Sequence, residues 1–446
     1  MPSKLTRRDF LRLSGLTLGS ALLTSCTGGK YPFGIGDNRP NFLIILTDDQ
    51  RFDTMQYMPK TQELIFDQGV TFSHGYVNSP LCGPSRANIL TGMHVHNHNV
   101  TTNKSDLDVE TFVEDLQSNG YFTGLVGKYI NQWKGEQRPE YDYWASIFRD
   151  ASRYYDPDIN VNGTWQWQIP GYITDIMRDL VLDFVDEASR KLKPFFLLFA
   201  LDAPHGPATP AHEDEGLYTD LPPHRPPNFN EEDISDKPET INWRPLFNDE
   251  EIEGIEEFRR KQILTLISAD RAIEAIVNKL EETGELDNTV IIFLSDNGKL
   301  WGEHRLESKG AVYEESIRVP FGLRYPPLVP EPYTEDKLVG SIDIAPTLYD
   351  LANIPIPEKF DGLSLVPLLT GGEWREEMFL ECWPSRGHWT AIHSGRYKYV
   401  ETDDHLSEFY DLEKDPYELE NMINNPEYQE IIAAMKVTLE REKIPQ

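Results

Sequence analysis

Four short apolar segments of the chain are each followed by polar residues that could do chemistry. The four sets are Asp48-Asp49, Lys128, Asp202 with His205, and Asp296-Asn297, which follow residues 42–46, 121–126, 195–200 and 290–294. Asp and Asn also start turns and cap helices, so one such set alone would carry little meaning. Turns and caps do not readily explain all four sets, which together favour one shared polar site.

A second motif, Cys82-Gly83-Pro84-Ser85-Arg86, opens a segment that ends at Gly92. A proline at the first helical position and a glycine at the end are typical of a short helix. The N-terminus of such a helix offers free N–H groups and the positive end of a dipole, which suits an oxyanion. Taken alone, the motif is explained more simply by a buried structural cysteine before a proline-capped helix.

The apolar segments have the length and composition of buried parallel strands. Helical patterns lie between them, notably over residues 173–191 and 257–282. Strands that alternate with helices predict βαβ units and a parallel sheet, in which ligands bind beyond the carboxyl ends of the strands. We therefore expect the four polar sets to lie at the same edge of one sheet.

A long connection, residues 206–248, follows His205 and is rich in proline and acidic residues. Long loops without regular structure in compact domains are usually functional or disordered. The connection could form a roof over the site and select the substrate, or it could be a passive insertion. The sequence leaves both possibilities open.

The composition is that of an acidic globular protein of 446 residues. Hydrophobic residues at 39% and aromatic residues at 11% exclude a disordered chain. The 42 basic and 74 acidic residues give a net charge of −32, which argues against a protein that binds a nucleic-acid backbone. Three widely spaced cysteines, Cys26, Cys82 and Cys382, cannot build a disulfide framework.

The first 25 residues have the composition of an export signal. A basic front is followed by an apolar stretch, residues 13–23, that is too short to span a bilayer. Arg7-Arg8 resembles the bacterial twin-arginine signal, and residues 23–26 resemble a lipoprotein cleavage box in which Cys26 is lipidated. The alternative is an N-terminal amphipathic helix of the fold. We expect a signal peptide over residues 1–25, a linker over 26–39, and a lipid anchor at the outer face of a membrane of the bacterial cell envelope.

The motif at Cys82 is part of a longer pattern that resembles the type I sulfatases. In that family Cys-x-Pro-Ser-Arg is followed by Leu-Thr-Gly, as at residues 82–86 and 90–92 here. Other family motifs occur in the same order at Asp48-Asp49, Gly127-Lys128, Pro204-His205, Asp296-Asn297-Gly298, residues 309–320 and residues 410–421. The resemblance implies an α/β fold of the alkaline-phosphatase type, with a mostly parallel sheet flanked by helices. It implies a catalytic domain over residues 40–372 and a small antiparallel α+β subdomain over 373–446.

In this family a maturation enzyme oxidises the motif cysteine to formylglycine, an aldehyde, so the resemblance implies this modification of Cys82. One hydroxyl of the aldehyde hydrate attacks the sulfur of a sulfate ester, and the other later expels the sulfate. The residues implied to be catalytic are Cys82, Arg86, Lys128, His205 and Lys309. Either His205 or Lys309 is the candidate to protonate the leaving alcohol.

The resemblance also implies one bound divalent cation. The expected ion is Ca²⁺, and Mg²⁺ is the alternative. Hard cations prefer oxygen ligands, and those implied are Asp48, Asp49, Asp296, the Asn297 amide and an oxygen of modified Cys82. A divalent cation together with Arg86, Lys128 and Lys309 contributes five positive charges, and the three carboxylates contribute three negative charges. The pocket therefore carries a net charge of about +2. An anionic substrate is therefore acceptable to this acidic protein.

Ile130 departs from the family pattern, because many sulfatases have a histidine two residues beyond the lysine. The sequence therefore does not identify the residue that acts as the base in the step that releases the sulfate. The string Gly-Lys-Tyr-x-Asn at 127–131 resembles the N-acetylglucosamine-6-sulfatase branch, and so do residues 46–50 and the group His94, His96 and His98. We interpret these histidines as a loop near the site, with a zinc site as the alternative.

Two residues outside these motifs need their own interpretation. His304 could contact the leaving group of the substrate or bond within its own loop, and the sequence favours neither. Cys382 has no motif around it and is interpreted as a buried thiol without a function.

The sequence thus predicts an exported, lipid-anchored sulfuric ester hydrolase. Its expected partners are a sulfated sugar or polysaccharide substrate and the maturation enzyme, with N-acetylglucosamine-6-sulfate as a narrower hypothesis. One alternative is a phosphate or phosphonate monoester hydrolase of the same superfamily. The other is a surface lipoprotein that binds sulfated glycans without hydrolysing them.

Overall fold

A ten-stranded mixed sheet, in the order β11-β2-β10-β9-β1-β8-β4-β5-β6-β7, lies at the centre of the described residues. The computed structural model describes residues 39–147, 153–191, 193–384, 387–403 and 406–444. Five neighbouring strands run parallel: β9 (Thr289–Ser295), β1 (Asn41–Thr47), β8 (Phe195–Ala200), β4 (Phe122–Gly127) and β5 (Tyr143–Ile147). The four predicted strands are therefore confirmed and are direct neighbours, so the residues that follow them meet at one edge of the sheet.

The outer strands on both sides of this parallel core are shorter and mostly antiparallel. They are β10 (Phe321–Arg324), β2 (Val70–Phe72) and β11 (Tyr333–Glu335) beyond β9, and β6 (Ile159–Val161) and β7 (Thr164–Gln166) beyond β5. The first four strands of the parallel core are buried at every position, which explains their continuous apolar sequences.

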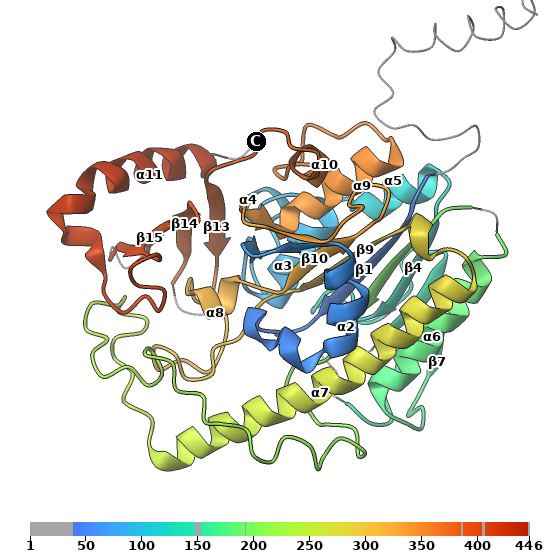
Figure 1. Cartoon of the computed structure of the whole chain (residues 1–446), viewed down its shortest axis with the longest axis horizontal. Coiled ribbons are helices and arrows are strands. Elements are labelled where there is room, and N and C mark those ends of the chain that lie inside the picture. Colours follow the sequence, from blue (N-terminus) through green and yellow to red (C-terminus); the bar gives the residue numbers. More distant parts are fainter. Residues whose placement is uncertain (1–38, 148–152, 192, 385–386, 404–405, 445–446) are drawn as a thin grey trace, which may run out of the picture. The chain divides into compact units, whose positions relative to one another are not determined.

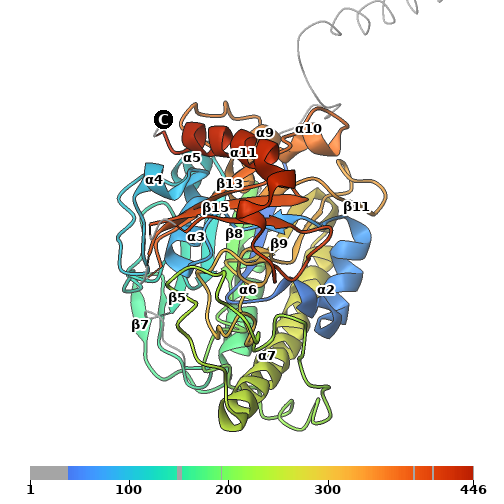
Figure 2. The same ribbon diagram turned by 90° about the vertical axis from the view of Figure 1, so that its left-hand side faces the viewer.

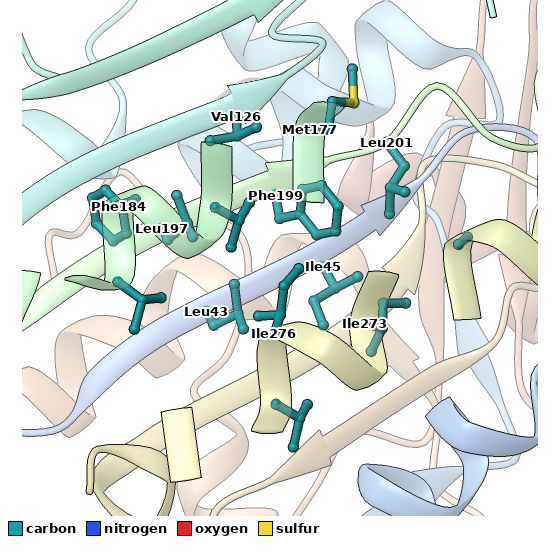
Figure 3. Packing of buried hydrophobic residues seen from close by; sticks show 14 of the residues in the cluster. Leu43, Ile45, Val126, Met177, Phe184, Leu197, Phe199, Leu201, Ile273 and Ile276 are labelled. Carbon is teal, nitrogen blue, oxygen red and sulfur yellow. The ribbon is translucent and has the colours of Figure 1, made fainter. Parts of the chain in front are cut away.

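Helices cover both faces of the sheet (Figure 1). One face carries α6 (Ile173–Ala188), α7 (Asp249–Glu282) and α2 (Pro59–Leu64), and the other carries α3 (Cys82–Thr91), α5 (Phe112–Ser118) and α9 (Ile344–Ala352). Leu43 and Ile45 of β1 pack with Ile273 of α7 and Phe184 of α6 in one hydrophobic cluster (Figure 3). This two-residue spacing along β1 is that of one face of a strand.

A smaller antiparallel sheet follows near the C-terminus, in the order β13-β14-β15-β16. Its strands are Met378–Cys382, Trp389–His393, Tyr397–Thr402 and Glu408–Asp411, and the helix α11 (Gln429–Glu442) covers one face (Figure 2). The opposite face, with Leu380 and the buried thiol of Cys382, packs against Leu300 and Tyr313. The predicted antiparallel unit is confirmed, while its boundary at residue 373 stays a prediction.

The remaining elements are short. They are the strands β3 (Gly75–Tyr76) and β12 (Val339–Gly340), the helices α4 (Val95–His98), α8 (Glu314–Ile317) and α10 (Leu365–Leu369), and the 3-10 turns Phe52–Tyr57, Phe66–Gln68, Leu286–Asn288, Ser341–Asp343, Met422–Asn424 and Pro426–Tyr428.

Two helices begin earlier than the sequence predicted. Helix α7 starts at Asp249 rather than residue 257, because Asn248 caps it by accepting from the N–H groups of Glu250 and Glu251 at 3.0 and 3.1 Å. Helix α3 starts at Cys82, which places Pro84 third rather than first. A proline is tolerated there because the first-turn N–H groups of a helix have no partner within it.

The predicted signal peptide, the lipidation site Cys26 and residues 26–38 of the predicted linker lie outside the described residues. Within the part that the structure describes, none of the helices combines the length and the hydropathy that crossing a membrane requires.

The ring of Phe184 gives a test of this packing. It is fully buried and contacts the rings of Phe122, Tyr143 and Phe195. We expect Phe184→Ala to lower the free energy of unfolding by about 3–5 kcal/mol, because it leaves a cavity between β4, β8 and α6. Urea unfolding measures this change. Val437→Ala, on a side chain that is 72% exposed, is the control, and equal effects of the two substitutions would contradict the packing.

Candidate active site

The ends of β1 and β9 bring four predicted site residues together. Thr47 pairs with Ser295, so the residues that follow both strands are neighbours. The N–H of Asp49 donates to Asp296 Oδ1 at 3.2 Å, and Asn297 Nδ2 donates to Asp49 Oδ1 at 2.6 Å. Three carboxylates are thus buried side by side at the sheet edge.

Two buried cations from other elements neutralise much of this charge. Arg86 of α3 donates from Nε to Asp296 Oδ2 at 2.8 Å and from Nη2 to Asp48 Oδ2 at 3.2 Å. Lys128, at the end of β4, donates to Asp48 Oδ2 at 2.6 Å. Arg86 also donates to the carbonyl of Lys128 at 2.7 Å, which links α3 to the end of β4.

Cys82 and Lys309 also contact these carboxylates. The sulfur of Cys82 is 3.3 Å from Asp48 Oδ1 and 2.7 Å from Lys309 Nζ. Lys309 Nζ also donates to Asp49 Oδ1. The residue that opens α3 is therefore in direct contact with a carboxylate and an ammonium group.

The surroundings of Cys82 keep its thiol protonated. Burial raises the pKa of the thiol, and the carboxylates of Asp296 and Asp48 raise it further, to well above its usual range. Burial also acts to raise the pKa of Asp48, but Lys128, His205 and Arg86 outweigh it and hold that pKa well below its usual range. Because the thiolate is the reactive form, an unmodified Cys82 is a poor nucleophile at neutral pH.

His205 lies at the mouth of the site, with its side chain 26% exposed. Its Nδ1 lies 2.8 Å from the carbonyl oxygen of Gly206, and its Nε2 lies 4.0 Å from Asp49 Oδ2. A histidine with one nitrogen fixed by its own loop and the other directed to the site can transfer a proton there.

The donor atoms fit a hard divalent cation. Ligand atoms of Asp48, Asp49, Cys82 and His205 all lie within 4.8 Å of one another. Asn297 Oδ1 is buried, and no donor from the described residues reaches it. A buried amide oxygen costs free energy unless something binds it, and a cation satisfies it. The carboxylate and amide oxygens are ligands that suit Ca²⁺ or Mg²⁺.

The structure places the other predicted histidines away from this cluster. His304 is fully buried, and its Nδ1 lies 2.7 Å from Glu231 Oε2. Nδ1 of His96 lies 2.9 Å from Glu381 of β13, and Nδ1 of His98 accepts from the N–H of Val100. His304 and His96 therefore contact other segments of the chain, whereas His98 bonds within its own loop. A substrate contact by His304 stays a prediction.

Two charged residues of the site were not found from the sequence. Lys299 Nζ lies 3.8 Å from Asp49 Oδ2, and its position directly after Asp296-Asn297-Gly298 was a usable signal. The buried Glu303 accepts from Arg51 Nη1 at 2.8 Å and lies 2.6 Å from His224 Nε2. Nothing in the sequence indicated this contact, because the three residues are far apart along the chain.

The connection 206–248 is bound to the loop that carries Lys309, which we call the Lys309 loop (residues 298–313). Besides the His224–Glu303 contact, Asn230 N donates to the carbonyl of Gly302 at 2.8 Å. Arg305 donates to the carbonyls of Glu231, Glu232 and Arg244 at 2.6–2.8 Å. This network favours the interpretation of the connection as a roof over that of a passive insertion.

A cavity of about 450 Å³ opens beside Lys309. Three parts of the fold line it. They are residues 238–244 of the connection, residues 300–312 of the Lys309 loop, and residues 384, 387–389, 400, 402, 403 and 408 in and beside the small sheet. The cavity can therefore receive a molecule whose reactive end reaches Lys309.

Family comparisons agree with this geometry along the chain. A family model described as Sulfatase matches residues 40–354, and one described as N-sulphoglucosamine sulphohydrolase, C-terminal, matches residues 302–444. The chain belongs to the sulfatase family. The predicted family is thereby confirmed.

Among similar proteins, human N-acetylglucosamine-6-sulfatase is 34% identical over 82% of this chain and 70% of its own length. N-acetylglucosamine-6-O-sulfatase of Bacteroides thetaiotaomicron is 28% identical over 93% and 87%. A protein solved in complex with its substrate D-glucosamine-2-N,6-O-disulfate shares 26% identity, with a TM-score of 0.80 over 91% of this sulfatase and 97% of that chain. The predicted α/β fold is confirmed. The sulfatase described here spans 49% and 32% of the lengths of extracellular sulfatase homologues from Caenorhabditis elegans and Drosophila melanogaster.

The Glu303 contact predicts a dependence of stability on pH. Burial acts to raise the pKa of Glu303, but Arg51 and His224 outweigh it and lower this pKa from 4.5 to about 2. The ionised Glu303 therefore stabilises the folded state above pH 4.5, and this stabilisation is lost as the pH falls toward 2. We expect the wild type to lose about 2 kcal/mol more stability than Glu303→Gln between pH 6 and pH 3. Urea unfolding at several pH values measures this.

Glu63→Gln, on a side chain that is 66% exposed, is the control for this experiment. It should keep the pH dependence of the wild type. Parallel pH profiles for wild type and Glu303→Gln would contradict the proposed contribution of Glu303.

Proposed function

We propose that this sulfatase removes sulfate from a sulfated sugar, with N-acetylglucosamine-6-sulfate as the first substrate to test. The observation that carries the proposal is the position of Cys82, buried between Asp48 and Lys309 at the edge of the sheet where the site residues meet. The names of the human and Bacteroides relatives support the sugar.

The proposal includes conversion of Cys82 to formylglycine. The high thiol pKa argues against thiol chemistry, whereas the hydrate of an aldehyde supplies a hydroxyl that can attack sulfur. Asp48 Oδ1, which the sulfur now contacts, is placed to accept a hydrogen bond from an oxygen at this position.

The cations of the site have separate roles in this proposal. Arg86 pairs with Asp48 and Asp296, and Lys128 pairs with Asp48, so both offset the charge of the buried carboxylates. Lys309 contacts Cys82 and also lines the cavity, so it can hold a sulfate oxygen or protonate the leaving alcohol.

His205 is our candidate for the base that expels the sulfate. Ile130, which stands where many sulfatases have a histidine, is buried and cannot accept a proton. A ring nitrogen of His205 lies within 4.8 Å of the Cys82 sulfur, and the ring is open to solvent. It can therefore take a proton from a group on residue 82 and release it to water.

Asp48, Asp49, Asp296 and Asn297 would hold a divalent cation, Ca²⁺ or Mg²⁺. Such an ion, when bound, makes a neighbouring hydroxyl a better nucleophile and polarises the sulfate oxygens. The unsatisfied Asn297 oxygen supports this part of the proposal.

Export and lipid attachment at Cys26 complete the proposal. An enzyme displayed at the cell envelope would meet sulfated polysaccharide fragments before they enter the cell. A mature protein that begins at residue 26 and partitions with membranes would support this. A soluble protein that retains residues 1–25 would contradict it.

The nucleophile is tested by the mass of the tryptic peptide that contains Cys82, from protein matured with a formylglycine-generating enzyme. We expect a mass about 18 Da below that of the thiol form. Cys82→Ala should abolish sulfate release from N-acetylglucosamine-6-sulfate, while Cys382→Ala, the matched buried cysteine, should retain it. An unmodified thiol in active protein would contradict the mechanism. Hydrolysis of phosphate monoesters in preference to sulfate monoesters would contradict the substrate class.

Removal of the metal gives an independent test that does not use activity. We expect a chelator to lower the melting temperature and Ca²⁺ or Mg²⁺ to restore it, since an ion at 100 times its Kd stabilises the folded state by about 2.7 kcal/mol. Asn297→Ala removes one ligand and should require a higher ion concentration for the same recovery. A melting temperature that does not respond to chelator or ions would contradict the metal site.

A further inference from the structure

The cavity beside Lys309 is lined by a second cation, Arg244, from the connection 206–248. Lys309 is occupied by Asp49 and Cys82. The guanidinium of Arg244 stacks on the ring of Trp243, with Cζ at 5.3 Å from the ring centroid. Trp243 also lines the cavity and is 54% exposed. The cavity thus has an aromatic surface and an arginine in addition to the lysine near Cys82.

The backbone at Arg244 is held in place by the Lys309 loop. Arg305 Nη1 donates to the carbonyl of Arg244 at 2.6 Å, and its other nitrogens donate to the carbonyls of Glu231 and Glu232. The indole N–H of Trp243 donates to the carbonyl of Thr240 at 3.1 Å. Arg244 and Lys309 are therefore presented to the cavity by two loops that are tied together, as a preorganised site requires.

The acidic residues of the cavity wall are already bonded to protein groups. Glu408 accepts from the hydroxyls of Tyr410 and Tyr313 at 2.6 and 3.1 Å. Asp403 accepts from the N–H of His388 at 3.1 Å, and its other oxygen lies 3.4 Å from His388 Nδ1. Both acids therefore already have hydrogen-bonding partners within the protein.

The size of the cavity suits one sugar residue with its substituents. Lys309 and Arg244 both line this volume of about 450 Å³, so a substrate held in the cavity can contact both side chains. An arginine binds sulfate or carboxylate oxygens with paired hydrogen bonds, which makes it selective for such groups.

We propose that Arg244, backed by Trp243, binds a second anionic group of the substrate, in addition to the ester sulfate that is removed. The enzyme then prefers sugars that carry two anionic groups. This inference rests on the proposed function, because the second group is recognised only if the ester sulfate lies at Cys82. The second group can be an N-sulfate on the same ring or the carboxylate of a neighbouring uronic acid.

The test compares kcat/KM for three substrates of the matured, full-length enzyme. These are N-acetylglucosamine-6-sulfate, D-glucosamine-2-N,6-O-disulfate, and a disaccharide in which N-acetylglucosamine-6-sulfate is linked to a uronic acid. We expect at least one doubly anionic substrate to have the higher kcat/KM in the wild type. Which of the two is preferred identifies the source of the anion.

We define the preference as kcat/KM for the preferred doubly anionic substrate divided by kcat/KM for the monosulfate. In Arg244→Gln this ratio should fall about 10- to 100-fold, which corresponds to the loss of a hydrogen bond to a charged group. Arg244→Lys keeps the charge but loses the paired geometry, so its ratio should lie between the two. Arg190→Gln, at an exposed position on the surface, is the matched control and should leave all three values unchanged. Melting temperatures establish that each variant is folded.

Loss of activity by the same factor on all three substrates, or an unchanged ratio in both Arg244 variants, would overturn the inference. So would a wild type that prefers the monosulfate. Absence of sulfate release from every substrate, in protein shown by mass to contain formylglycine, would instead refute the proposed function and the inference with it.

Discussion

Three carboxylates are buried at the ends of two parallel strands, and their charge must be compensated by groups from other parts of the fold. Asp48, Asp49 and Asp296 are almost without exposure to water. An ionised carboxylate in such a place costs several kcal/mol unless cations and hydrogen bonds compensate it. Arg86 and Lys128 provide that compensation from inside the fold, so α3 and the end of β4 both contribute to the site at the ends of β1 and β9.

The groups that hold the site together come from distant parts of the chain, so the site forms only when these parts are folded together. Lys309 belongs to a loop with no regular structure of its own. That loop is fixed by Glu303, which Arg51 and His224 contact from two other segments. It is also packed against the small C-terminal sheet through Leu300 and Tyr313. The small sheet therefore supports the edge of the main sheet where the site residues meet, as well as lining the cavity.

The connection 206–248 is an irregular segment that specific hydrogen bonds hold in place beside the cavity. It lacks helices and strands, yet its carbonyl groups accept from Arg305 at several points and its side chains contact Glu303 and His304. Side-chain donors replace the backbone ladders that regular structure would supply. A wall built in this way depends on contacts with the Lys309 loop and not on pairing with the main sheet.

The parallel strands could be predicted from the amino-acid sequence, because fully buried strands are continuous apolar runs. The edge where Asp48, Lys128 and Asp296 meet followed from those strands, and the cysteine motif indicated the family. Three contacts became visible in the folded structure alone: Glu303 with Arg51 and His224, His304 with Glu231, and the cavity that Arg244 shares with Lys309. Those contacts join residues with no periodic spacing between them. A strand or helix produces a periodic pattern in residues that are close together in the sequence. Contacts between two irregular loops produce no such pattern, because they depend on the path of the whole chain.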